Sequence, residues 1–132
     1  MIWPQAKVHV GNEKVVWVTN VYCSPSLTPK WSDVPSRPAY DRASGLHAAQ
    51  VFAGDFNSVA RSELYARMKK LRLALANNQM PTRSRGDLQS RIDLFWTNHD
   101  PSLLDFRVFS EQISDHYPVE LVLRDTSPLQ TQ

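Results

Sequence analysis

The chain has 132 residues, of which 42% are hydrophobic and 21% are charged, and its formal net charge at pH 7 is +2. This length suits one domain, the apolar content is ordinary for a globular protein, and the slight basic excess is compatible with a phosphate-bearing partner. The lone cysteine, Cys23, excludes an internal disulfide and weakly favours a reducing compartment. The four histidines lack the spacing of a structural zinc site: His9, His47, His99 and His116.

The sequence gives no indication of secretion or of membrane insertion. Residues 1–4 do not form a basic region followed by an apolar stretch, so no signal peptide is expected. No apolar run is long enough to span a bilayer. We therefore expect a soluble intracellular protein, with the nuclear and cytoplasmic compartments both open.

Two strands are predicted near the N-terminus, over residues 7–10 and 14–22, joined by a turn at residues 11–13. The second strand is apolar on both faces, which is typical of a central strand. Because side chains alternate along a strand, Asn20 and Tyr22 share a face. Residues 23–45, rich in Pro, Ser and Trp, predict an irregular surface loop. Its Trp31 and Tyr40 could cover a substrate or only anchor the loop by packing.

The next elements are a short strand at residues 51–53 and a helix at residues 62–75. Leu64, Met68, Leu71 and Leu75 recur at helical spacing, which predicts a core-facing stripe. The pair Asn77-Asn78 is a reasonable helix stop, because Asn tolerates the left-handed conformation. A polar loop over 83–89 and strands over 92–97, 106–109 and 119–123 follow.

Strands mixed with one clear helix indicate a layered fold of the α/β or α+β class. We expect one domain over residues 1–124, without internal repeats, and a frayed polar tail over residues 125–132.

Three acid-bearing turns, each beside a short apolar run, are the strongest functional signal. They occupy residues 54–57 (Gly-Asp-Phe-Asn), 90–93 (Ser-Arg-Ile-Asp) and 114–118 (Ser-Asp-His-Tyr-Pro). Together they supply three carboxylates, one imidazole and one carboxamide. Such a set can hold a hard metal ion and handle a phosphate ester.

Each turn also has a purely structural interpretation. Asp55 and Asn57 are residue types favoured in turns. Asp93 needs a partner if it is buried, and both Arg91 and His116 are candidates. Asp115 and His116 diverge in an extended chain, so one can bind a metal while the other faces the substrate, and a second carboxylate that oriented His116 would complete an acid–base pair. The alternative is a solvated loop.

Basic residues gather around the middle acidic turn. Arg83, Arg85 and Arg91 flank it and are candidate substrate-binding residues. The cluster over residues 69–72 is better explained as a solvated helix end.

The order and spacing of these motifs resemble the endonuclease/exonuclease/phosphatase superfamily, and most of all the endonuclease domains of non-LTR retrotransposons. Residues 18–25 look like the strand that carries an active-site Tyr or His, and the three turns match the Gly-Asp-x-Asn, late-strand Asp and Ser-Asp-His motifs. The resemblance implies a four-layer α/β/β/α sandwich with mostly antiparallel or mixed sheets. This chain would supply the C-terminal portion of that domain.

The resemblance also implies a role for each matched residue. Asp115 would help to hold a divalent metal, Mg²⁺ or Mn²⁺, and His116, oriented by Asp93, would contact the scissile phosphate or act as a base. Asp55 would position or deprotonate the attacking water, or protonate the leaving oxygen. The remaining roles go to Asn57, which would hold Asp55 or the phosphate, and to Tyr22, which would donate a hydrogen bond to the phosphate.

The family's first half normally brings an Asn and a Glu that is the main metal ligand, and neither motif is matched here. Glu13 lies in a predicted turn and is not assigned that role. Three explanations are a fragment of a longer gene product, a second polypeptide that completes the site, and a shortened variant that folds alone. We favour the first.

The leading functional hypothesis is a metal-dependent phosphodiesterase, in particular an endonuclease acting on DNA. One alternative is a non-catalytic remnant or binding module, which the missing Glu favours. The other is a phosphatase acting on a small molecule or lipid, because basic loops serve either substrate.

Overall fold

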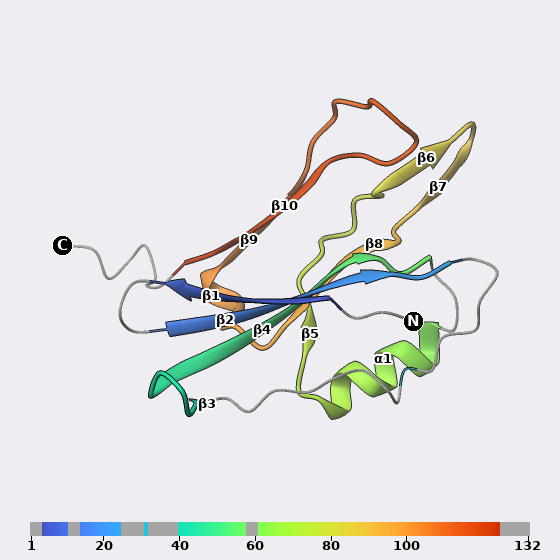
Figure 1. Ribbon diagram of the computed structural model, residues 1–132. Helices are drawn as coiled ribbons and strands as arrows, with labels where there is room; N and C mark the ends of the chain where they lie inside the picture. Colours follow the sequence, from blue (N-terminus) through green and yellow to red (C-terminus); the bar gives the residue numbers. More distant parts are fainter. Residues whose placement is uncertain (1–3, 11–13, 25–30, 32–39, 58–60, 125–132) are drawn as a thin grey trace.

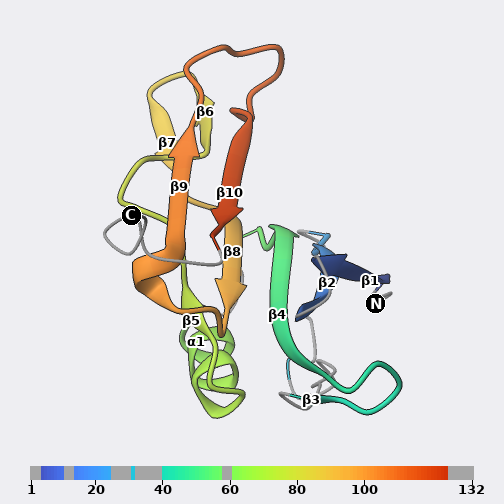
Figure 2. The ribbon, with the colours of Figure 1, turned by 90° about the vertical axis from the view of Figure 1, so that its left-hand side faces the viewer.

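A computed structural model describes residues 4–10, 14–24, 31, 40–57 and 61–124 of the chain. Its centre is a six-stranded sheet, with a helix against one face and a two-stranded sheet over the other (Figures 1 and 2). This arrangement confirms the prediction of a layered α/β fold. The turn over residues 11–13, most of the Pro-rich loop and the tail over residues 125–132 lie outside the described residues.

The central sheet has the strand order β1-β2-β4-β8-β5, and β3 pairs with β4 beside this path. β2 and β4 are parallel and the other pairs are antiparallel, so the sheet is mixed as expected. β2 is an interior strand, in agreement with its apolar pattern. The strands are β1 (Gln5–Val10), β2 (Lys14–Tyr22), β3 (Tyr40–Asp41), β4 (Leu46–Asp55), β5 (Ala74–Leu75) and β8 (Asp93–Thr97).

β4 is longer than the strand expected at residues 51–53, because it begins at Leu46 and runs to Asp55. Its first residues are less uniformly apolar, which hid them from a pattern search. Parallel pairing with the whole of β2, from Lys14 opposite His47 to Tyr22 opposite Asp55, supports the extra length. This long pairing places the ends of β2 and β4 side by side.

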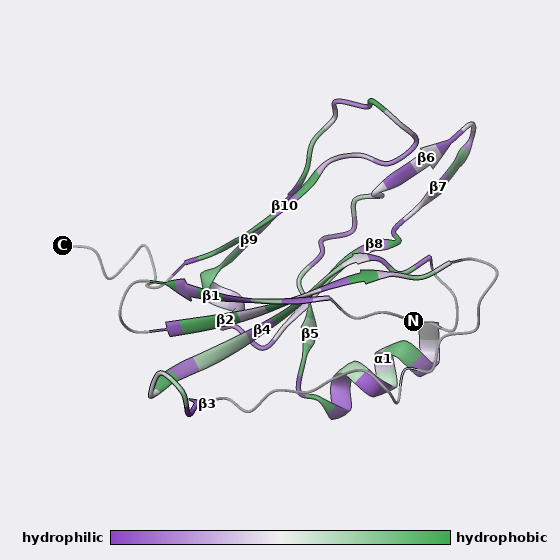
Figure 3. Cartoon of the chain, in the orientation of Figure 1, coloured by the Kyte–Doolittle hydropathy of each residue, from purple (hydrophilic) through white to green (hydrophobic). Residues whose placement is uncertain are grey.

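Apolar side chains pack on both faces of the sheet, as the hydropathy of β2 and β4 indicates (Figure 3). Phe52, Leu94 and Trp96 pack on the helix side with Leu64 and Met68. Trp31 stacks on Phe56 at 5.9 Å between ring centroids and is fully buried. Of the two roles open to Trp31, the structure therefore selects packing. The opposite face carries Val16, Ala49 and Val51, with Phe95, Leu121 and Leu123 against them.

The helix α1 (Arg61–Lys70) is shorter than the expected helix over residues 62–75. The N–H of Leu73 bonds to the carbonyl of Met68 and the N–H of Arg72 to that of Lys69, the two bonds of a Schellman cap. Arg72 takes the left-handed conformation there, with φ 61°. The assignment of Asn77-Asn78 as the helix stop is therefore wrong. Leu75, the last member of the apolar stripe, packs against the core from β5 and not from the helix.

Two hairpins extend from the sheet (Figure 1). The region expected as a polar loop over 83–89 is instead the hairpin of β6 (Arg83–Arg85) and β7 (Leu88–Ser90). Its turn contains Gly86 at φ 60°, a conformation that glycine adopts without steric cost. The second hairpin, β9 (Leu104–Val108) with β10 (Val119–Leu123), agrees with the two late strands expected from the sequence. A short 3₁₀ helix, η2 (Pro101–Leu103), leads into β9.

Among the described residues, no helix is both long and apolar enough to cross a membrane.

Candidate active site

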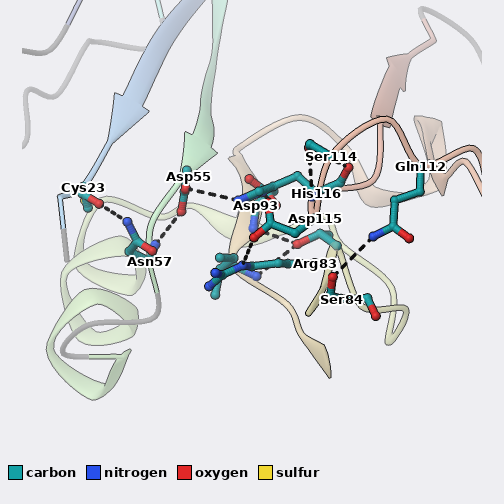
Figure 4. Close-up of polar contacts among 12 residues, drawn as sticks. Cys23, Asp55, Asn57, Arg83, Ser84, Asp93, Gln112, Ser114, Asp115 and His116 are labelled. Atoms are coloured by element: carbon teal, nitrogen blue, oxygen red, sulfur yellow. Dashed lines mark hydrogen bonds and ion pairs between the residues drawn. The ribbon is translucent and has the colours of Figure 1, made fainter. Parts of the chain in front are cut away.

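The three acid-bearing turns meet at one end of the central sheet. β4 ends at Asp55 and β8 begins at Asp93, and these two residues lie directly opposite each other in the antiparallel pair. His116 comes from the segment between β9 and β10, which forms a bridge to Arg83 at the start of β6. Residues distant in sequence therefore converge where the ends of β4 and β8 meet the segment that carries His116 (Figure 4).

The imidazole of His116 lies between two carboxylates. Its Nδ1 is 2.8 Å from Oδ2 of Asp93, and its Nε2 is 3.9 Å from Oδ2 of Asp55. Since a carboxylate only accepts, Nδ1 carries the hydrogen of the short bond, and Nε2 of the neutral ring is left as an acceptor. The geometry is that of a histidine oriented by one carboxylate, with its second nitrogen free to exchange a proton. Of the two partners considered for Asp93, the structure selects His116.

Asn57 stabilises the turn that follows Asp55. Its N–H donates to Oδ1 of Asp55 at 2.9 Å, and its side-chain amide donates to the carbonyl of Cys23 at the end of β2. Asn57 adopts φ 49°, a left-handed conformation that Asn tolerates. The turn interpretation is therefore correct, and the same turn orients Asp55 and ties β4 to β2. The site interpretation stays a prediction.

Burial sets the acidity of Asp55. It raises the pKa of this carboxyl, and the nearby charge of Asp93 acts in the same direction. The N–H of Asn57, the protonated form of His116 and the charge of Arg83 act in the opposite direction but do not cancel the rise. A carboxyl with a raised pKa is suited to transfer protons near neutral pH.

Asp115 has the opposite environment. Its Oδ2 accepts from Nε of Arg83 at 3.1 Å, and this hydrogen bond lowers the pKa of the carboxyl. The side chain is 40% exposed, and Asp115 does not belong to the cluster formed by Asp55, Asp93 and His116. The surroundings therefore shift the pKa values of Asp55 and Asp115 in opposite directions. In active sites with two acids, such a difference lets one carboxyl transfer protons while the other stays ionised.

The other expected site residues are Tyr22 and three arginines, which lie outside the cluster of Asp55, Asp93 and His116. Tyr22 lies opposite Asp55 in the β2–β4 register, and its side chain is 64% exposed. Arg83 and Arg85 line a small pocket of about 180 Å³ on the β6–β7 hairpin, together with Leu88 and Ser90. Arg91 points elsewhere, and its Nη1 donates to the carbonyl of Asn78 at 2.8 Å.

A divalent cation fits this donor set in part. One ligand atom each from Asp55, Asp93 and His116 lies within 4.8 Å of the others, and the two carboxylates are the hard oxygen donors that Mg²⁺ prefers. The bond between Asp93 and His116 already occupies one oxygen and one nitrogen. Mg²⁺ commonly takes one or two carboxylates and completes its shell with water and substrate phosphate, so Asp55 is the best-placed ligand of the cluster.

Two residues at the site were missed by sequence reasoning. The buried hydroxyl of Thr82 accepts from the N–H groups of Ile92 and Asp93, and the amide of Asn77 donates to the carbonyl of Asp93. Their partners lie 10 to 18 residues away in sequence, so no local pattern could have indicated these contacts.

The comparisons with known proteins agree with this geometry. Residues 9–116 match the model of the Endonuclease/Exonuclease/phosphatase family, so the chain belongs to that family. A search of curated protein sequences found no match. Among solved structures, the chain is similar to the endonuclease domain of TRAS1, a telomere-specific non-LTR retrotransposon, with a TM-score of 0.67 at 19% identity. That likeness covers 92% of this chain and 61% of the TRAS1 domain, and it confirms the expected fold.

Proposed function

We propose that this chain carries the proton-transfer part of a metal-dependent phosphodiesterase that cleaves DNA. The observation that carries the proposal is the His116 imidazole held between Asp93 and Asp55 at the shared end of β4 and β8. Hydrolysis of a phosphodiester needs a proton removed from the attacking water and a proton given to the leaving oxygen. An oriented histidine beside a carboxyl of raised pKa can divide these two tasks.

Each residue then has a definite part. Asp93 holds His116 in the tautomer whose Nε2 accepts a proton, and the imidazolium formed is stabilised by the same carboxylate. Before a cation binds, the raised pKa of Asp55 lets this carboxyl exchange a proton with an oxygen bound beside Nε2. A bound cation would keep Asp55 ionised, and Asp55 would then act as a ligand and proton acceptor while His116 carries the proton. Tyr22 is an exposed residue, and its hydroxyl would donate to a phosphate oxygen.

We further propose Mg²⁺ or Mn²⁺ as the cofactor, held by Asp55 together with phosphate oxygens and water. When bound, the cation would offset the charge that grows on the phosphoryl oxygens. The family resemblance assigns a ligand role to Asp115, whereas the ion pair at 3.1 Å makes it the partner of Arg83. Asp115 would then act by orienting this guanidinium toward the substrate.

DNA is the proposed substrate because the pocket on the β6–β7 hairpin is basic and close to the site. Arg83 and Arg85 line it, and Arg83 is near enough to lower the pKa of Asp55. Guanidinium groups bind phosphate with paired hydrogen bonds. Arg91, whose side chain bonds to Asn78, is a weaker candidate for this role.

The test is a nicking assay on supercoiled plasmid and on an abasic oligonucleotide, with and without Mg²⁺. Asp55→Ala and His116→Ala are expected to reduce kcat by at least about 100-fold, as loss of a general acid or base does. His9→Ala is the matched control, because His9 is exposed on β1. Equal activity of Asp55→Ala and the wild-type chain would show that the site is assigned wrongly.

A binding module without catalysis is the second candidate. This candidate is favoured because two carboxylates of the site already have partners and are less available to a metal ion. Asp93 pairs with His116, and Asp115 pairs with Arg83. Calorimetry discriminates between the enzyme and the module. Saturable binding of Mg²⁺ that Asp55→Asn abolishes supports the enzyme, whereas DNA binding without cation binding or cleavage supports the module. A separate activity assay tests the third possibility, because hydrolysis of phosphomonoesters in preference to DNA would support a phosphatase.

A further inference from the structure

Asp93 is held through its main chain by side chains from two other segments. Oγ1 of Thr82, a fully buried residue, accepts from the N–H of Asp93 at 3.0 Å and from the N–H of Ile92 at 3.1 Å. Nδ2 of Asn77 donates to the carbonyl of Asp93 at 2.9 Å, and its Oδ1 accepts from the N–H of Phe95 at 2.8 Å. The N–H and the carbonyl of Asp93 therefore each have a side-chain partner.

These side-chain contacts take the place of main-chain pairing along the part of β8 that the short strand β5 does not reach. β5 pairs with β8 only at Trp96 and Thr97, and the N–H of Ala76 adds one bond to the carbonyl of Phe95. Beyond that point, the side-chain amide of Asn77 offers one donor and one acceptor, as a peptide group does. Buried peptide groups are costly when they lack a partner, so the start of β8 depends on Asn77 and Thr82.

Thr82 also binds the segment that carries His116. Its carbonyl accepts from the N–H of Tyr117 at 2.8 Å, and its own N–H donates to the carbonyl of Ser90 at 2.9 Å. One buried residue therefore links the chain at Asp93 to the chain next to His116. The side chains of these two segments meet in the 2.8 Å bond between His116 and Asp93.

We propose that Thr82 and Asn77 are positioning residues that align Asp93 with His116. Neither residue touches the reacting groups, and both act by fixing the main chain from which Asp93 projects. The consequence for catalysis rests on the proposed function, but the alignment itself does not. A displacement of about 1 Å at such a pair can cost about 100-fold in rate.

The direct readout is the imidazole N–H of His116, observed by proton NMR through its bond to Asp93. The resonance is expected in the wild-type chain and in Thr82→Ser, which keeps the hydroxyl. It is expected to shift or disappear in Thr82→Val and in Asn77→Leu, which remove the bonding atoms but keep the approximate shape. Thr97→Val is the matched control, because Thr97 is a buried threonine at the far end of β8 that donates to the carbonyl of Gln50 at 2.7 Å.

Kinetics supply the second readout. Thr82→Val and Asn77→Leu are expected to lower kcat about 100-fold with little change in KM, while Thr82→Ser recovers most of the rate. If the wild-type chain cleaves no DNA, the proposed function fails while the NMR experiment still decides the alignment. An unchanged His116 resonance in folded Thr82→Val and Asn77→Leu would overturn the proposal.

Amide hydrogen exchange of the wild-type chain covers the case in which these variants do not fold. The amides of Ile92 and Asp93 are expected to be protected to the same degree as those in the middle of β8. Fast exchange at both amides would show that Thr82 does not hold this segment.

Discussion

Asp55 illustrates how one residue can serve chemistry at a cost to stability. Its carboxyl is partly buried, lies opposite Asp93 and has a raised pKa, so the fold favours the protonated form. The protonated Asp55 contributes its full stabilisation of the fold below the pKa of an unfolded Asp, about 3.9. This contribution is lost as the pH rises through the raised pKa of Asp55 in the folded state. At neutral pH, an ionised Asp55 therefore destabilises the fold.

Asp55→Asn removes this penalty, because the amide stays neutral and can still accept from the N–H of Asn57. We expect the variant to be more stable than the wild-type chain at pH 7, with the difference shrinking toward pH 4, while activity is lost. Urea unfolding at both pH values in the presence of EDTA measures the difference.

Asp100 provides a control, because its pKa is shifted in the opposite direction to that of Asp55. The N–H and the hydroxyl of Ser102 bond to its carboxylate and lower its pKa. Asp100→Asn should therefore be less stable than the wild-type chain at pH 7, and this deficit should shrink as the pH falls below about 4, through the pKa of an unfolded Asp. A stability gain for Asp55→Asn that did not depend on pH would contradict the role given to burial.

At the scale of elements, the pairing of β2 with β4 depends on Gly54. This residue has φ +144°, and a Cβ built on it would lie 1.9 Å from the carbonyl oxygen of Val21. Only glycine allows the two backbones to approach so closely just before Asp55. The small residue in the Gly-Asp-Phe-Asn turn is therefore a structural requirement of the site.

Gly54→Ala is expected to reduce the free energy of unfolding by roughly 4 kcal/mol or more, in the range of the most damaging single substitutions. Gly86→Ala is the matched control, because φ is +60° there but no atom lies within 4 Å of the added Cβ. That variant should lose only about 1 kcal/mol, the cost of the left-handed conformation. Similar urea midpoints for the two variants would contradict the close approach at Gly54.

For the whole molecule, the site exists only if the β9–β10 sheet is docked on the central sheet, because the segment joining its strands carries His116. Phe106 of β9 packs edge-on against Phe95 of β8, with ring centroids 5.9 Å apart, and Leu121 and Leu123 of β10 pack on the same face. Packing distant from the site therefore decides whether His116 reaches Asp93.

Phe106→Ala is expected to lower the free energy of unfolding by about 2 kcal/mol, less than the loss of a fully buried ring would. It should also lower kcat while KM changes little. Arg107→Ala is the control from the same strand. Its side chain is 65% exposed and its pair with Glu120, at 3.1 Å, is of the solvent-exposed kind worth at most about 1 kcal/mol. Thermal unfolding and the nicking assay should separate the two variants, and equal effects would argue against this role of docking.

The strands with strong apolar patterns and the order of the three acid-bearing turns could be predicted from the sequence, because both are local properties. β10 and the interior position of β2 followed from such patterns. The C-terminus of α1 could not be read in this way, because Arg72 adopts a left-handed cap that its residue type does not favour. The β6–β7 hairpin was hidden by its polar composition.

The contacts that join the turns became visible only in the folded chain. The fold paired Asp93 with His116 and Asp115 with Arg83, which the sequence had left open or arranged differently. It also placed Thr82 and Asn77 behind Asp93. These hydrogen bonds join segments that lie far apart in the sequence, so they depend on how the strands and layers pack together and not on a local pattern of residues.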